Sequence, residues 1–145
     1  MADQKGVIDS PIEKVNRHIQ DYVETDGQQG HEWKGAPSLL LTTIGRKSGV
    51  RRRTALIYGT DGDRYVLVAS HGGNAKHPEW YLNLTANPNV DVQIYGEQFE
   101  AVAHEVSGDE KARLWRMMNT LWHDYDHYQA RTEREIPVLV LERKP

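Results

Sequence analysis

The sequence has no cysteine among its 145 residues. Disulfide scaffolds, thiol nucleophiles, iron–sulfur clusters and cysteine-based zinc sites are therefore excluded. A chain without cysteine is compatible with a reducing cytoplasm, and a cytoplasmic location is our expectation. Redox chemistry in such a chain has to come from a bound group rather than from a protein thiol.

Long apolar runs are missing as well. No segment approaches the roughly 20 apolar residues that a helix needs to cross a bilayer. The polar residues 1–6 lack the apolar core of a signal peptide, which agrees with the cytoplasmic expectation. The length predicts one compact domain that folds without covalent cross-links.

Positive charge is not in excess. The chain has 18 lysines and arginines and 21 aspartates and glutamates, a net charge of −3 with the histidines neutral. Nucleic-acid-binding domains usually show the opposite balance, so we expect no nucleic-acid partner. Residues 46–53 nevertheless hold a strip of five cations, namely Arg46, Lys47, Arg51, Arg52 and Arg53. So short a strip on an acidic chain favours a small anionic ligand.

The N-terminal segment, residues 1–35, is expected to contain one helix. Ser10 and Glu13 have the spacing of a capping box, and Pro11 suits the first helical position. Apolar residues follow at helical spacing, namely Ile12, Val15, Ile19, Tyr22 and Val23. Such a face usually packs on its own protein, and the alternative is peripheral contact with the inner face of the cell membrane.

From residue 36 onward the pattern changes, and residues 36–145 are expected to form the main, strand-rich part of the same structural domain. Strands are expected at 38–44, 53–58, 65–70, 90–95, 99–106 and 136–141, and helices at 78–86 and from 107 to about 125. Most connections are too short for parallel crossovers. The pattern therefore predicts an α+β fold with about six mostly antiparallel strands in a barrel or strongly curled sheet, and three helices in all.

The cationic strip begins in a glycine-flanked turn. Gly45 and Gly49 free the backbone around Arg46, Lys47 and Ser48, so that amides, a hydroxyl and two cations can converge on a phosphate or carboxylate. A solvated hairpin tip is the alternative. Against that alternative, the arginines continue into the next strand, where like charges are poorly tolerated without a counter-ion.

A second candidate site is the strand end at residues 70–74. Ser70 and His71 offer hydrogen bonds, and the glycines that follow allow the backbone to approach a ligand closely. The segment contains no nucleotide-binding fingerprint. A flexible loop without a ligand is the alternative.

Aromatic residues form the third candidate. Trp80 and Asn83 share one side of the expected helix at 78–86. Trp122, Tyr125 and Tyr128 follow each other at intervals of three, which would let them wall a flat ligand. Core packing is the alternative for both groups.

Protein-borne catalytic groups are not evident. His123 and His127 have the spacing of two helical zinc ligands, but no third ligand is obvious, so we expect no metal. The serine-hydrolase motif Gly-x-Ser-x-Gly does not occur. Cationic and aromatic surfaces without a nucleophile or metal cluster fit an enzyme whose chemistry resides in an organic cofactor.

Taken together, four motifs resemble the family of deazaflavin (F420)-dependent nitroreductases and F420H2-dependent quinone reductases. They are LLTTIGRKSG at 40–49, PEWYLNL at 78–84, ANP at 86–88 and IPVL at 136–139. The family consists of actinobacterial split β-barrel oxidoreductases that use the reduced coenzyme F420. The resemblance implies a split β-barrel, F420 as the cofactor and hydride transfer to a small-molecule acceptor: a quinone, an activated enone or a nitroaromatic compound. Related barrels bind FMN, so an FMN oxidoreductase and a non-catalytic F420 carrier stay as alternatives, as do a monomer and a homodimer.

The resemblance also implies roles for individual residues. The cofactor's phosphate and acidic tail would be held by Arg46, Lys47 and Ser48. The cofactor would run along Arg52, Arg53, Thr54, Ala55, Leu56 and Ile57. Its ring would be bordered by Val68, Ala69, Ser70 and His71, and the site closed by Glu79, Trp80, Tyr81, Leu82 and Asn83. The acceptor would meet Trp122, Tyr125 and Tyr128. A proton could come from Tyr125, Ser70 or solvent.

Overall fold

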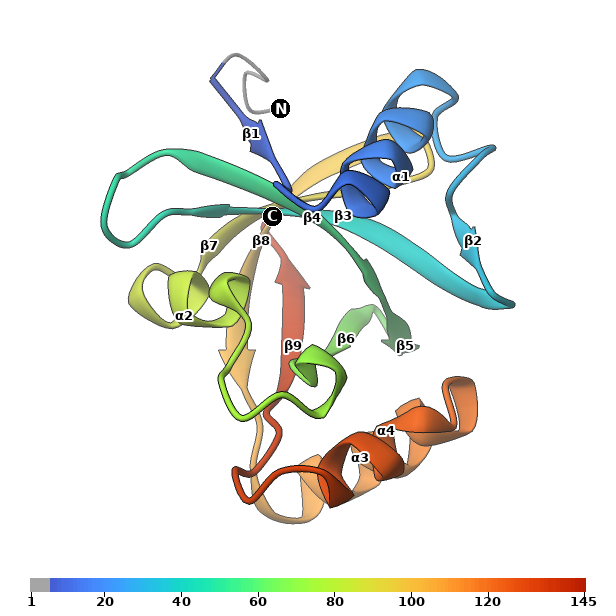
Figure 1. The fold of residues 1–145 in the computed structure, drawn as a ribbon, viewed down its shortest axis with the longest axis vertical. Coiled ribbons are helices and arrows are strands. Elements are labelled where there is room, and N and C mark those ends of the chain that lie inside the picture. Colours follow the sequence, from blue (N-terminus) through green and yellow to red (C-terminus); the bar gives the residue numbers. More distant parts are fainter. Residues whose placement is uncertain (1–5) are drawn as a thin grey trace.

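Residues 6–145 are described in the computed structural model of the chain. The helices are α1 (Glu13–Glu24), the 3-10 turn η1 (His71–Gly73), α2 (Glu79–Ala86), α3 (Gly108–Leu121) and α4 (Asp124–Ala130). The strands are β1 (Ile8–Asp9), β2 (Glu32–Trp33), β3 (Ala36–Ile44), β4 (Arg51–Ile57), β5 (Gly59–Asp61), β6 (Arg64–Val68), β7 (Asn89–Ile94), β8 (Glu97–Glu105) and β9 (Val138–Arg143). Figure 1 shows their arrangement.

A single nine-stranded sheet organises this mixed α+β fold. Its strand order is β1-β4-β3-β7-β8-β9-β6-β5, with β2 paired to β3, and every pairing except that of β1 with β4 is antiparallel. Strands β4 and β5 lie near opposite ends of this order, yet only Tyr58 separates them in the chain. The sheet must therefore curl until its two ends meet, as the ribbon in Figure 1 illustrates where β4 runs into β5.

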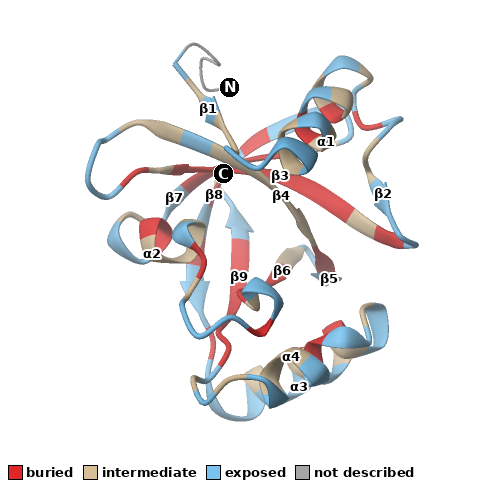
Figure 2. Cartoon of the chain, in the orientation of Figure 1, coloured by how far each residue is buried: buried red, intermediate tan, exposed pale blue. Residues whose placement is uncertain are grey.

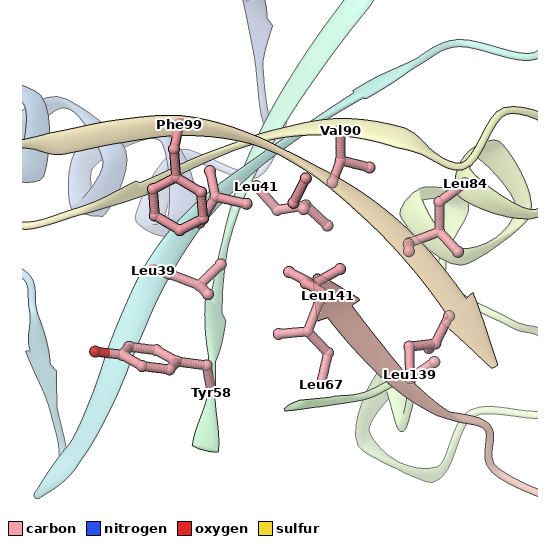
Figure 3. Packing of buried hydrophobic residues seen from close by; sticks show 13 residues of the cluster. Leu39, Leu41, Tyr58, Leu67, Leu84, Val90, Phe99, Leu139 and Leu141 are labelled. Carbon is pink, nitrogen blue, oxygen red and sulfur yellow. The ribbon is translucent and has the colours of Figure 1, made fainter. Parts of the chain in front are cut away.

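The interior of the curl holds the main core. Leucines of β3, β6 and β9 meet there, among them Leu39, Leu67 and Leu139, together with Phe99 of β8 (Figure 3). The helices turn one side to the protein and the other to solvent (Figure 2). On α1, Ile19 and Tyr22 are fully buried against Leu40, and burial of an isoleucine contributes about 1.5–3 kcal/mol.

The start of α1 differs from the expected capping box. The helix begins at Glu13, and the residue before it, Ile12, makes no side-chain capping bond. Instead, the Ser10 hydroxyl accepts a hydrogen bond from the Ile12 amide at 3.2 Å, and Pro11 stays outside the helix. Ile12 is 62% exposed rather than part of the packed face. The parallel pairing of β1 with β4 moves the helix start to this position, since it fixes residues 8 and 9 in extended backbone.

The number of elements also differs from the prediction. The six expected strands correspond to β3, β4, β6, β7, β8 and β9, and the additional ones are β1, β2 and β5, which have two or three residues each. Pairings this short leave almost no periodic signal in the sequence.

The expected helix from 107 to 125 is in fact two helices. Helix α3 ends at Leu121, and Trp122 has extended backbone before α4 begins. Asp126 holds α4 against α3, because its carboxylate accepts hydrogen bonds from Trp115 Nε1 at 2.7 Å and Asn119 Nδ2 at 2.9 Å. Within residues 6–145, no helix has the length and apolar content to span a bilayer.

Candidate functional site

A cavity of about 670 Å³ lies between the N-terminal segment, strand β4, the loop that holds η1, helix α2 and the α3–α4 corner. Most predicted site residues line it. These are Arg52, Arg53, Thr54, Ala55, Leu56, Ile57, Val68, Ser70, His71, Glu79, Trp80, Asn83, Trp122, Tyr125 and Tyr128. The strand end at residues 70–71, the aromatic residues and the strand part of the cationic strip thus share one cavity, whereas the turn at residues 45–49 lies outside its lining.

Six predicted residues do not line the cavity. Arg46, Lys47 and Ser48 lie in the turn between β3 and β4, and Leu82 lies on α2. Ala69 is fully buried in the core. The Tyr81 hydroxyl donates a hydrogen bond to Glu105, and burial together with this bond raises the pKa of Tyr81 to about 12.

A second group of lining residues could not be predicted from the sequence. They come mainly from the N-terminal segment and are Ile8, Asp9, Ser10, Pro11, Ile12, Lys14, Val15, His18, Trp33, Ser38, Thr43, Gly72 and Pro78. The parallel β1–β4 pairing places Asp9 opposite Arg53. A two-residue strand has no pattern from which this pairing could be read, although the arginine-rich strand indicated that counter-ions were needed.

Counter-ions neutralise much of the cationic strip. Arg46 pairs with Glu79 at 2.7 Å, Arg51 with Asp91 at 2.6 Å and Arg53 with Asp9 at 2.6 Å. Burial raises the pKa of Asp91, and Arg51 opposes that shift. Within residues 6–145, no acidic side chain forms an ion pair with Lys47 or Arg52. These two cations remain available to an anionic ligand.

Asn83 connects the cationic turn to the cavity. It is 3% exposed. Its Oδ1 accepts hydrogen bonds from the backbone amide of Arg46 at 3.2 Å and from Arg46 Nη1 at 2.9 Å, while its Nδ2 donates to Thr43 Oγ1 at 3.3 Å. Arg46 also donates to Glu79, which holds the pKa of that carboxyl below its usual range. The turn is thereby fixed against α2.

Close packing within the turn explains its first glycine. A Cβ on Gly45 would lie 2.7 Å from Ser48 Oγ and 3.1 Å from the Val50 carbonyl oxygen. Residues 45 and 50 are tied by a hydrogen bond from the Gly45 amide to that carbonyl at 2.8 Å. A larger residue at position 45 would displace the Ser48 hydroxyl and crowd the Val50 carbonyl.

The aromatic wall belongs both to the cavity and to the core. Tyr125 is 4% exposed and packs near Trp115 and Tyr128, each with a ring-centroid separation of 6.2 Å. Burial raises the pKa of Tyr125 well above its ordinary value. A tyrosine hydroxyl is protonated at physiological pH even at its ordinary pKa of about 10, so Tyr125 can donate a hydrogen bond to a bound molecule.

Comparison with known proteins identifies the family. The family model described as F420H(2)-dependent quinone reductase matches residues 14–143. Over 137 residues the chain is 42% identical to an F420H(2)-dependent quinone reductase of Mycobacterium tuberculosis, and the match covers 92% of each protein. The chain belongs to the F420H(2)-dependent quinone reductase family. The family resemblance of the motifs is thereby confirmed.

Solved structures extend the comparison. An F420-H2-dependent reductase, FDR-A, has a TM-score of 0.68 and 39% identity, covering 73% of this chain and 94% of its own. A structure described as a domain-swapped dimer has a TM-score of 0.71 and 35% identity, covering 92% of this chain and 100% of its own. A heme storage protein of Vibrio cholerae has a TM-score of 0.60 and 17% identity over 87% of this chain and 89% of its own, which shows a shared fold alone.

The residues present fit the cofactor of an F420H(2)-dependent quinone reductase. F420 combines a flat deazaflavin ring with a phosphodiester and an oligoglutamate tail. The cavity offers flat aromatic side chains, Trp80 and Trp122, for a ring. Lys47 and Arg52 offer cations without acidic partners in the described chain for the anionic groups.

Proposed function

We propose that this chain transfers a hydride from reduced F420 to a quinone, or to a related electron-poor acceptor such as an activated enone or a nitroaromatic compound. The observation that carries the proposal is one cavity whose lining joins Arg52, a cation outside the ion pairs of residues 6–145, to an aromatic wall with a tyrosine hydroxyl, Tyr125. Membership of the F420H(2)-dependent quinone reductase family supports the choice of donor and acceptor.

In this proposal the cationic turn holds the anionic part of the cofactor. Lys47, Arg52 and the Ser48 hydroxyl bind phosphate or carboxylate oxygens, and each charge-assisted hydrogen bond contributes about 1.5–3 kcal/mol. Arg46 has a different role, since Glu79 and Asn83 already engage its guanidinium. It shapes the turn and keeps Glu79 from repelling the ligand.

The walls of the cavity supply orientation and a dry environment. Bound F420H2 supplies the hydride, and its transfer to a conjugated acceptor depends mainly on holding two flat molecules face to face. Ile57, Val68 and Trp80 contribute apolar surface that excludes water. Tyr125 holds a proton beside the cavity and donates it to the reduced acceptor, with Ser70 as the neighbouring hydroxyl.

A parallel titration with F420 and FMN tests the cofactor assignment. Trp80 and Trp122 line the cavity, so their fluorescence should be quenched when a ligand binds. We expect F420 to bind at least tenfold more tightly than FMN. Tighter binding of FMN would contradict the assignment, and F420 binding without turnover of its reduced form by menadione or cyclohexenone would favour a carrier.

We further propose that the curled sheet is a split β-barrel and that the protein forms a homodimer. The single residue between β4 and β5 and the structural likeness to the heme storage protein support the barrel. The similar structure described as a domain-swapped dimer supports dimerisation. Light scattering during gel filtration would show a mass of two chains, whereas a monomeric mass would refute the dimer.

Location is also part of the proposal. We propose a cytoplasmic protein that contacts the membrane surface peripherally. Two exposed apolar side chains near the cavity support this contact: Ile8 is 46% exposed and Ile12 is 62% exposed. Co-sedimentation with vesicles of bacterial phospholipid would test the contact. An Ile8→Ser, Ile12→Ser variant should lose it, and equal sedimentation of both proteins would refute it.

A further inference from the structure

The loop that carries Ser70 and His71 has an unusual backbone. Three consecutive residues have positive φ, His71 at 49°, Gly72 at 61° and Gly73 at 81°. The left-handed conformation of a non-glycine residue costs on the order of 1–3 kcal/mol and persists only where the surrounding structure enforces it. Because His71 lines the cavity, this strain lies at the proposed active site.

Arg134 makes the contacts that hold this loop. Its guanidinium donates hydrogen bonds to three loop carbonyls: Nε to Asn74 at 2.9 Å, Nη2 to Ser70 at 2.8 Å and Nη1 to Ala69 at 3.3 Å. A fourth bond joins Nη1 to His77 Nδ1 at 3.1 Å. A guanidinium can only donate, so Nδ1 of His77 must accept and the ring must be neutral.

Arg134 is itself firmly placed. Gln129 of α4 donates from Nε2 to the Arg134 carbonyl at 2.8 Å, and its Oε1 accepts from the Ile136 amide at 3.0 Å. No carboxylate forms an ion pair with Arg134 within residues 6–145. Its hydrogen bonds to the loop therefore account for the position of the guanidinium.

The loop is also pressed against α4. A Cβ on Gly73 would lie 2.7 Å from the Tyr128 carbonyl oxygen and 3.0 Å from its Cα. This contact fixes one side of the turn, and Arg134 closes the other side by binding the Ala69, Ser70 and Asn74 carbonyls. The arginine thus connects the loop with Ser70 and His71 to the helix with Tyr125.

We propose that Arg134 is a positioning residue for the reductase reaction: it fixes the left-handed loop so that Ser70 and His71 face the cavity beside Tyr125. The arginine does not line the cavity, so it acts through the loop. This inference rests on the proposed function for its effect on turnover, while its effect on the loop is independent of any activity.

Two variants test the inference. Arg134→Met keeps the apolar stem and removes all four hydrogen bonds, and Arg134→Lys keeps the charge but can satisfy only part of the set. We expect the Met variant to lose at least tenfold in kcat with menadione, since small misplacements at an active site have effects of up to about 10²-fold. The Kd for oxidised F420 should change less than threefold, and the Lys variant should recover part of the kcat.

Hydrogen–deuterium exchange of the protein without cofactor supplies the second readout. The amides of Gly73 and Asn74 donate within the loop, to Ser70 and His71. In the Met variant they should exchange at least fivefold faster, while the amides of β9 keep their protection. Arg143→Met, which removes an arginine paired with Glu97 on the surface, serves as control and should match wild type in both assays.

The outcomes separate the two proposals. If wild-type protein does not oxidise reduced F420 with any acceptor, the proposed function fails, and loop exchange still decides whether Arg134 fixes the loop. Wild-type kcat and wild-type loop exchange in Arg134→Met would overturn the inference. The inference would also be overturned if the amides of the loop and of β9 lost protection to the same extent in Arg134→Met and in Arg134→Lys. That result would indicate that Arg134 stabilises the whole fold rather than the loop.

Discussion

Tyr125 is the candidate proton donor among the residues that line the cavity. Burial raises the pKa of its hydroxyl, so the group is protonated at neutral pH, as an exposed tyrosine is too, and is a weaker acid than an exposed tyrosine. We predict that Tyr125→Phe lowers kcat with menadione about tenfold or more and leaves the Kd for F420 within threefold, because a proton donor contributes typically 10²–10⁴-fold. Steady-state kinetics and fluorescence titration measure the two quantities. Unchanged kcat would exclude the tyrosine as an obligatory donor.

Lys47 and Arg52 carry the second prediction at this scale. With both changed to alanine, F420 should bind at least tenfold more weakly, and the dependence of its Kd on salt should become shallower, because fewer charge contacts remain to be screened. Arg116→Ala, on the exposed side of α3, is the matched control. Identical Kd values and salt slopes in the double variant and the control would show that the turn is only a solvated surface.

The sequence predicts the role of a single residue where an unusual run or motif contains it, but it does not predict the residue's partners. The row of arginines in β4 indicated that counter-ions were required, and Asp9 and Asp91 provide them. Their identities could not be predicted, because Asp9 reaches Arg53 through a parallel pairing of two residues and Asp91 comes from another strand. Asn83 was recognised as a site residue, but its bonds to Arg46 depend on how α2 packs on the sheet.

Secondary-structure elements were predictable to the extent that they were long. The six longer strands are mostly apolar runs or, in β7 and β8, alternations of apolar and polar residues, and the sequence predicts each of them to within about two residues. The break between α3 and α4 was missed because the apolar spacing continues through Trp122. Hydrogen bonds from Asn119 and Trp115 to Asp126 stabilise the corner, and such side-chain contacts leave no periodic signal.

The hairpin of β5 and β6 offers a pH-dependent prediction at the scale of elements. Arg113 of α3 and Arg64 of β6 bind Asp61 and hold the pKa of its carboxyl well below the ordinary value. A carboxyl whose pKa is lower in the folded than in the unfolded chain stabilises the fold at pH values above its unfolded-state pKa of about 3.9. This stabilisation is lost as the pH falls through the folded-state pKa.

Asp61→Asn should therefore lower the urea midpoint at pH 7. The difference in urea midpoint between the variant and wild type should become smaller as the pH falls below about 4. In that range Asp61 of the unfolded wild-type chain binds a proton, while Asp61 of the folded protein stays ionised. Asp63→Asn, in the same hairpin, serves as the control. A gap that stays constant from pH 7 to pH 3 would contradict the role of Asp61 in joining α3 to the sheet.

At the scale of the whole molecule, the curled sheet explains why one cavity gathers distant segments. The sequence predicted antiparallel pairing and a barrel-like curl, but not the strand order, which depends on long-range packing of leucines from β3, β6 and β9. It also predicts residues 1–35 as a helical segment of the same domain, without a part in the site. In the structure that segment lines the cavity through β1, α1 and Trp33.

The distribution of charge is also a property of the whole molecule. The total of −3 argues against a nucleic-acid partner, and three of the five cations in residues 46–53 are paired with carboxylates. The other two, Lys47 and Arg52, are the cations that we propose for one small polyanionic cofactor.

Single-turnover oxidation of reduced F420 by menadione tests the central claim most directly. Protein, reduced F420 and menadione are mixed in a stopped-flow instrument, and the return of oxidised F420 absorbance is followed against the reaction without protein. The account predicts strong acceleration that requires all three components, and a slower reaction when F420 has been reduced with deuterium. A rate equal to that of the protein-free mixture would contradict it.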